Sequence, residues 1–120
     1  GKVDVMVHQE TDPEGECGTP YPAITIDECF EDPLTGCYLK LICNCNNGQK
    51  GMTLNAYAKT DITCSKGVKE QTHLIANGEC TEFDNVDCEG NHIGVYEMIA
   101  ESEWDENCKI TCESKSRLLR

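Results

Sequence analysis

The hydrophobic and polar positions at the start of the chain alternate with a period of two. One parity holds Val3, Val5 and Val7, and the other holds Lys2, Asp4, Met6 and His8. Successive side chains of a β-strand point to opposite faces of its sheet, so this pattern predicts a half-buried strand over 2–8. Two alternatives are open for this strand. It completes the chain's own sheet, or it is added to the sheet of a neighbouring copy.

A second alternating pattern predicts a β-hairpin in the middle of the chain. The runs CYLKLICNC (37–45) and MTLNAYAK (52–59) flank NNGQKG (46–51), which contains an Asn-Gly turn signal. Leu39 and Leu41 share their parity with three cysteines, so we expect disulfides on the inner face. Thr53, Asn55 and Tyr57 fall on the opposite parity and are expected to point outward.

Shorter patterns predict the remaining elements. Strand candidates lie at 23–27, 61–64, 72–76, 80–83 and 109–114, and 93–100 fits either a strand or one helical turn. A short helix is expected at most near 95–107. We therefore predict an all-β fold: a disulfide-stapled antiparallel β-sandwich or jelly-roll-like barrel with little helix. Its parts would be an N-terminal strand (1–10), a Pro/Gly-rich linker (11–22) and a disulfide-rich β domain (23–120).

The amino-acid composition indicates that disulfides must stabilise this fold. Among the 120 residues, Val, Ile, Leu and Phe total only 23, and the net charge is −12. Such a chain buries too little apolar surface to offset its ordering entropy unless cross-links assist. The even number of cysteines predicts five disulfides and no free thiol. The cysteines are Cys17, Cys29, Cys37, Cys43, Cys45, Cys64, Cys80, Cys88, Cys108 and Cys112.

The disulfides indicate where the protein is found, and its net charge indicates which classes of partner it can bind. Disulfide frameworks persist in secreted proteins and rarely in the cytosol, so we expect a mature, soluble, secreted protein. No apolar run approaches the ~20 residues of a membrane span, which predicts no membrane insertion. The strongly acidic composition also argues against a nucleic-acid partner.

Candidate catalytic and metal-binding residues are sparse. Ten paired cysteines leave no thiol nucleophile, and His8, His73 and His92 are scattered along the chain. Cys43-x-Cys45 does not have the usual zinc spacing. We therefore predict no enzyme, no catalytic residue, no cofactor and no dedicated metal site. The acidic loop within 85–97 departs from an EF-hand pattern, and weak calcium binding is the alternative left open there and at 12–16.

Self-assembly is the leading functional hypothesis. Residues 1–36 carry nine acids and one base, whereas 109–120 carry four bases and one acid. An acidic head and a basic tail suit head-to-tail contacts between copies, and strand addition by residues 2–8 would link them into a filament. The chain would then be an extracellular structural protein with copies of itself as partners. The predicted interface consists of Val3, Val5, Val7, Trp104, Arg117 and Arg120. For Trp104 a second role is also open, as a lid on the edge of a small core.

Two other functions are compatible with the sequence. A secreted signalling ligand or pheromone would act as a discrete species through a protein receptor. A protease inhibitor or toxin would present the loop SKGVKEQ (65–71), in which Lys66 or Lys69 could enter a trypsin-like pocket.

Overall fold

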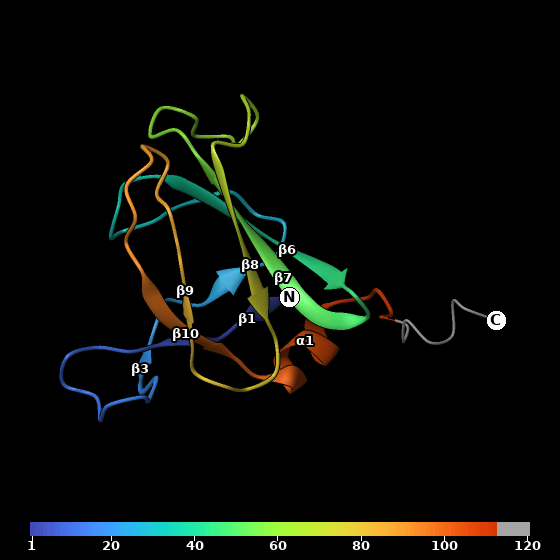
Figure 1. Cartoon of the computed structure of the whole chain (residues 1–120). Helices are drawn as coiled ribbons and strands as arrows, with labels where there is room; N and C mark the ends of the chain where they lie inside the picture. Colours follow the sequence, from blue (N-terminus) through green and yellow to red (C-terminus); the bar gives the residue numbers. More distant parts are fainter. Residues whose placement is uncertain (113–120) are drawn as a thin grey trace.

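The computed structural model describes residues 1–112, which form ten strands in antiparallel sheets and one short helix (Figure 1). The bounds are β1 Lys2–Val3, β2 Val5–Val7, β3 Thr19–Pro20, β4 Ile24–Thr25, β5 Phe30–Glu31, β6 Tyr38–Asn46, β7 Gln49–Tyr57, β8 Glu70–Ile75, β9 Thr81–Phe83, β10 Val95–Ile99 and α1 Glu101–Asn107.

The predicted hairpin forms the largest sheet, with strand order β5-β6-β7-β8. β6 pairs with β7 along nine residues, from Tyr38 opposite Tyr57 to Asn46 opposite Gln49. The turn between them is Asn47-Gly48, and both residues have positive φ angles, 53° and 78°. Asn and Gly adopt this left-handed backbone at low cost, so the two-residue turn matches the twist of the flanking strands.

The opening strand lies in the chain's own sheets. A break at Asp4 divides it into β1, which pairs with β4, and β2, which lies between β3 and β10. The sheet order is β3-β2-β10-β9, so neighbours occupy both edges of β2. β3 belongs to the predicted linker, which is therefore partly strand and is also tied down by the Cys17–Cys80 disulfide.

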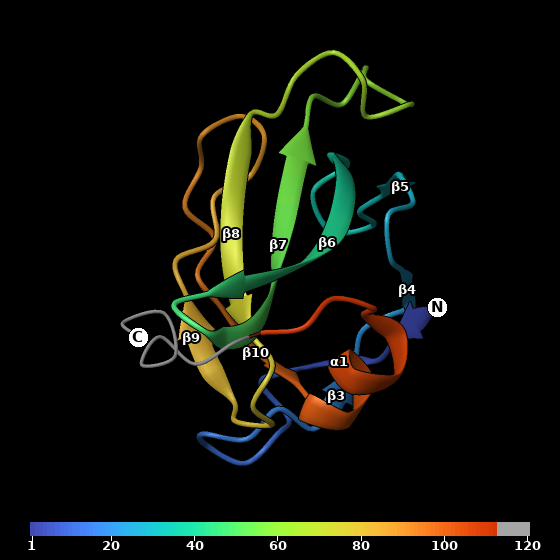
Figure 2. The same cartoon turned by 90° about the vertical axis from the view of Figure 1, so that its right-hand side faces the viewer.

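The hydrophobic core lies between the two four-stranded sheets. The inward parity of the hairpin is buried as predicted, with Leu39, Leu41, Met52 and Leu54 in the core. Figure 2 shows β6, β7 and β8 side by side, with β9 and β10 on one flank and α1 near the amino end. The prediction of an all-β, disulfide-stapled antiparallel fold with little helix is confirmed.

The residues of β7 that were expected to point outward are not exposed, which corrects the prediction. Thr53, Asn55 and Tyr57 are buried instead of exposed. β7 is a central strand, so side chains from both neighbours cover it. His73 of β8 lies 3.0 Å from the Thr53 hydroxyl, and Gln71 donates to Asn55 at 2.9 Å. Cross-strand polar pairs of this kind satisfy the buried polar atoms.

Two predicted strands are absent from the described part of the chain. Residues 61–64 form a turn because the buried Asp61 carboxylate accepts the N–H groups of Ser65 at 3.0 Å and Lys66 at 2.8 Å. Residues 109–112 are irregular, and 113–114 lie outside the described residues. The prediction of a strand at 61–64 was wrong because hydrogen bonds from the backbone to the Asp61 side chain replace those of a sheet.

All ten cysteines are paired, as predicted. The pairs are Cys17–Cys80, Cys29–Cys64, Cys37–Cys88, Cys43–Cys108 and Cys45–Cys112. Each bond closes a loop of at least 35 residues, so each restricts the unfolded chain considerably. In residues 1–112, no helix has the length and apolar character needed to cross a membrane.

Candidate functional site

An apolar cavity of about 260 Å³ lies between the two large sheets. Its walls are built by the inward-facing parity of strands from both sheets, so the same alternation that makes the core also makes the cavity. The apolar wall residues are Val5, Val7, Ile24, Leu39, Leu41, Leu54, Leu74 and Val95.

The rim of the cavity carries apolar side chains that are exposed to solvent. Leu34 is 74% exposed, Ile93 is 40% exposed and Tyr96 is 41% exposed, and all three line the cavity. The six exposed large hydrophobic residues of the described chain therefore include three at this one opening. Such clustering of exposed apolar surface is typical of a binding site.

One end of the cavity is polar and acidic. The buried Asp32 carboxylate accepts the Tyr21 hydroxyl at 2.9 Å, the Leu34 N–H at 3.2 Å and the Thr35 hydroxyl at 2.8 Å. Burial, followed by the negative charges of Asp32 and Glu97, raises the pKa of the Tyr21 phenol. Asp32 is thus held in place by donors that satisfy both of its oxygens.

Glu97 is the second acid that lines the cavity. It lies on β10 with its backbone opposite Val7 on one side and Thr81 on the other. Burial and the neighbouring Asp32 charge raise the pKa of the Glu97 carboxyl to about 7. Hydrogen bonds make no contribution to this pKa shift, and no buried side-chain oxygen of residues 1–112 lacks a partner, so the Glu97 oxygens reach solvent.

The raised pKa of Glu97 predicts a pH dependence of stability. The unfolded carboxyl has a pKa near 4.5, so between pH 4.5 and about 7 the unfolded state loses this proton before the folded state does. The free energy of unfolding therefore falls as pH rises through this window, by on the order of 2 kcal/mol after allowing for partial exposure. We expect Glu97→Gln to stabilise the protein at pH 8 and to leave it unchanged at pH 4.5.

Urea unfolding of the oxidised protein at both pH values measures this difference. Glu106→Gln, at an exposed position of α1, is the matched control and should behave like the wild type at both pH values. An equal effect of Glu97→Gln at pH 4.5 and pH 8 would contradict the assignment.

The structure buries the valines predicted to form the assembly interface. Val3 is 0% exposed and Val5 is 3% exposed, and Val7 is partly buried beside the cavity. Of the two alternatives for the opening strand, the single chain adopts the one in which the strand completes its own sheets. Exchange of this strand between copies stays a prediction, and it would first require withdrawal of the strand from β3, β4 and β10.

Trp104 is a core residue, so within the single chain it takes the second of the two roles expected of it. It is 2% exposed, and its indole N–H donates to the Gly51 carbonyl at 2.7 Å. The polar residues around it in the sequence form the exposed face of α1, so the helix directs the single tryptophan inward. Arg117 and Arg120, the other predicted interface residues, lie outside the described residues.

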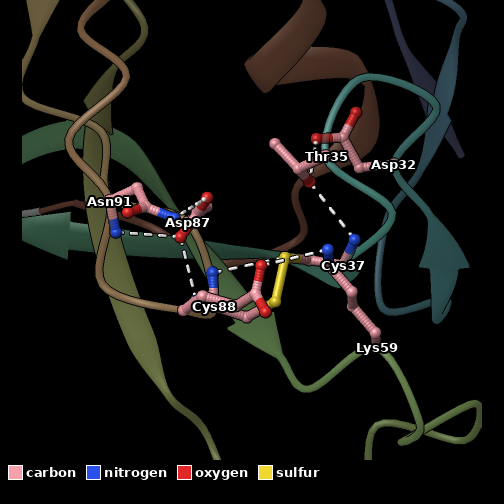
Figure 3. Close-up of polar contacts among 8 residues, drawn as sticks. Asp32, Thr35, Cys37, Lys59, Asp87, Cys88 and Asn91 are labelled. Atoms are coloured by element: carbon pink, nitrogen blue, oxygen red, sulfur yellow. Dashed lines mark hydrogen bonds and ion pairs between the residues drawn. A yellow bond between two sulfur atoms is a disulfide. The ribbon is translucent and has the colours of Figure 1, made fainter.

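In the acidic loop considered for calcium, groups of the same loop bind the Asp87 carboxylate, and Lys59 pairs with Glu89 at 3.0 Å. Figure 3 shows the Asp87 carboxylate bonded to Asn91, beside the Cys37–Cys88 disulfide. Asp87 also accepts the Glu89 N–H at 2.9 Å. Hydrogen bonds from Asn91 are the main reason that the pKa of Asp87 is lowered. Residues 1–112 contain no group of three or more His, Cys, Asp or Glu side chains placed to hold a metal ion.

The loop considered for protease inhibition is braced at its base. The Cys29–Cys64 disulfide and the Asp61 carboxylate hold its start, and Lys69 N–H donates to the Ala56 carbonyl at 2.8 Å. Lys66 and Lys69 are both exposed. These features are compatible with the inhibitor hypothesis, which stays a prediction.

Sequence reasoning missed the cavity and its polar groups, Tyr21, Asp32 and Glu97. For Glu97 a signal was present, because in a strand over 93–100 it shares its parity with Val95 and Ile99. A carboxylate on an otherwise apolar strand face is costly without a function or a partner. Asp32 follows a short strand in a turn-forming segment, EDPLTG, where an aspartate is ordinary.

Comparisons with protein-family models, curated proteins and solved structures give no match. The geometry of the cavity is therefore the basis for a functional proposal.

Proposed function

We propose that this chain is an extracellular, non-enzymatic protein that binds a small apolar molecule between its two large sheets. The observation that carries the proposal is the apolar cavity of about 260 Å³ with polar groups at one end. Small-molecule sites are typically concave and mostly apolar, with a few polar groups that orient the ligand. An apolar cavity of roughly 150 Å³ is large enough to bind benzene, so a larger molecule fits here.

The packing of the fold also supports a binding role. Protein interiors are usually close-packed, and voids larger than a water molecule are few. An empty apolar cavity lowers stability because its walls lose contacts. Here five disulfides stabilise the fold independently of core packing, so the chain can tolerate a cavity that most small domains would fill. They also support an extracellular location.

Binding of a neutral apolar fluorophore, N-phenyl-1-naphthylamine, tests the proposal. We expect saturable binding with one molecule per chain and a rise in fluorescence. Val95→Phe places a larger side chain in the cavity wall and should weaken binding by at least about tenfold, since the ring takes up ligand volume. Val68→Phe makes the same change at an exposed position of the 65–71 loop and should leave binding unchanged.

Thermal unfolding of each variant shows whether it is folded. If Val95→Phe fails to fold, Ile93→Arg at the exposed rim provides the second test, because a charge there opposes entry of an apolar ligand. Absence of saturable binding to the folded wild type would overturn the proposal. Binding that is equally strong in every folded variant would also overturn it, because the probe would then occupy another surface.

The three functions considered from the sequence remain proposals of lower rank. Self-assembly by strand addition would first require β2 to leave its place between β3 and β10. Protease inhibition would use the 65–71 loop, whose residues do not line the cavity. Binding of a small molecule is compatible with a signalling role, in which the protein would carry or present the ligand to a receptor.

A further inference from the structure

We propose that the ligand of this cavity is an amine, with an apolar body between the sheets and a protonated amino group at Glu97 and Asp32. This inference rests on the proposed function and specifies the chemical class of its ligand. Its basis is the distribution of hydrogen-bond donors and charges at the polar end of the cavity.

At the polar end of the cavity, Glu97 is the carboxyl group that a donor from the ligand can reach. Both oxygens of Asp32 already accept protein hydrogen bonds, whereas no donor in residues 1–112 contacts the Glu97 carboxyl group. An ionised carboxylate only accepts hydrogen bonds. Glu97 is only partly buried and its oxygens still reach solvent, but burial and the nearby Asp32 charge disfavour its ionised form. A cationic donor beside Glu97 would offset this cost.

The charges favour a cationic donor over a neutral one. The ionisable residues among the described cavity-lining residues include two carboxylic acids and no lysine or arginine. A positive charge placed beside Glu97 and Asp32 offsets their mutual repulsion, and a charge-assisted hydrogen bond is roughly twice as strong as a neutral one. An anionic ligand would be repelled both here and by the net charge of −12.

The cavity also sets the size and character of the apolar body. The volume of about 260 Å³ and the leucine and valine walls suit a compact aromatic body, and one ring with a short alkyl chain is the smallest example. Leu34 and Ile93 at the rim would contact the part of the ligand that enters last. An arylalkylamine such as 2-phenylethylamine is therefore the simplest probe of the proposed class.

Amine binding should weaken in acid, because protonation of Glu97 removes one of the two negative charges. Other groups also face this region and must be considered. Asp32 follows β5, Tyr21 lies between β3 and β4, His8 follows β2, and Tyr96 neighbours Glu97 on β10. A protonated His8 would repel an ammonium as well, so His8→Gln is needed to separate its contribution from that of Glu97.

Displacement of N-phenyl-1-naphthylamine by three ligands of similar shape tests the inference: 2-phenylethylamine, 2-phenylethanol and 3-phenylpropanoate. At pH 8 we expect the amine to bind at least about tenfold more tightly than the alcohol, and the carboxylate to bind more weakly than both. Between pH 8 and pH 5 the preference for the amine should shrink. His8→Gln should retain this pH profile.

Glu97→Gln is the decisive variant, because it keeps the shape of the side chain and removes its charge. It should weaken amine binding by about tenfold at pH 8 and leave binding of the alcohol unchanged, whereas Glu106→Gln should change neither. Equal affinity of the wild type for amine and alcohol would overturn the inference. Retention of the amine preference in folded Glu97→Gln would also overturn it.

The failure of this inference is distinguishable from failure of the proposed function. If the neutral fluorophore binds and the amine has no advantage, the cavity binds apolar molecules without selecting amines. If the fluorophore itself does not bind to the folded protein, both proposals fail.

Discussion

Val5→Asp is expected to abolish the cooperative fold. Val5 is 3% exposed on β2, between β3 and β10, and its side chain lies in the core. A carboxylate at this position would be buried without a partner, and the cost should exceed ~4 kcal/mol. Because small domains are stable by only about 5–15 kcal/mol, we expect a large loss of folded protein, measured by near-ultraviolet circular dichroism and urea unfolding.

Lys2→Asp is the control for Val5→Asp. It introduces the same side chain into the same segment at an exposed position, so it should leave the free energy of unfolding within about 0.5 kcal/mol of the wild type. The pair of variants also tests the strand-addition hypothesis. If residues 2–8 acted mainly between copies, Val5→Asp would give a folded monomer that fails to polymerise. That outcome would contradict the role of β2 within its own chain.

Trp104→Ala is expected to have the second largest effect. Trp104 is 2% exposed, contacts the core and donates a hydrogen bond to the Gly51 carbonyl. A seven-residue helix such as α1 is too short to be stable alone, so packing of its apolar side chain must hold it. Removal of a buried aromatic ring costs about 3–5 kcal/mol, which corresponds to a Tm lower by on the order of 15 °C.

Two further substitutions separate the contributions at this position. Trp104→Phe keeps an aromatic ring in the core and loses the indole donor. It should lower the free energy of unfolding less than Trp104→Ala does, and the difference between the two variants reports the packing of the ring. Glu106→Ala changes an exposed residue of the same helix and should be nearly neutral. Differential scanning calorimetry measures all three. A Tm of Trp104→Ala within about 2 °C of the wild type would match the effect of about 0.5 kcal/mol that is usual for surface changes, and would contradict its position in the core.

The strands that sequence analysis located best are those with long, clean alternation. In the hairpin, Leu39 and Leu41 of one strand and Leu54 of the other face the core, and a one-residue shift of either strand would turn its leucines to the opposite face. The Asn-Gly pair then fixed the turn. Residues 61–64 have no such redundancy, and one buried side chain, Asp61, was enough to replace the predicted strand by a turn.

The candidate site depends on contacts that no local pattern encodes. Glu97 lies on β10, Asp32 follows β5 and Tyr21 lies between β3 and β4, so the members of each pair are more than ten positions apart in the chain. Only the packing of the β2-β10 pair over the β6-β7-β8 sheet brings them to one cavity. The burial of Trp104 has the same origin, because its polar neighbours along the chain gave no indication of what α1 packs against.

The amino-acid sequence by itself determined the class of this protein. Its ten cysteines, low content of large aliphatic residues and period-two patterns specify an all-β domain held by disulfides, because composition and local alternation fix which faces are buried. Tertiary structure alone decided which cysteines pair, where the opening strand lies and that a cavity remains between the sheets. These properties arise from contacts between residues distant in sequence, and their energies depend on three-dimensional packing rather than on local pattern.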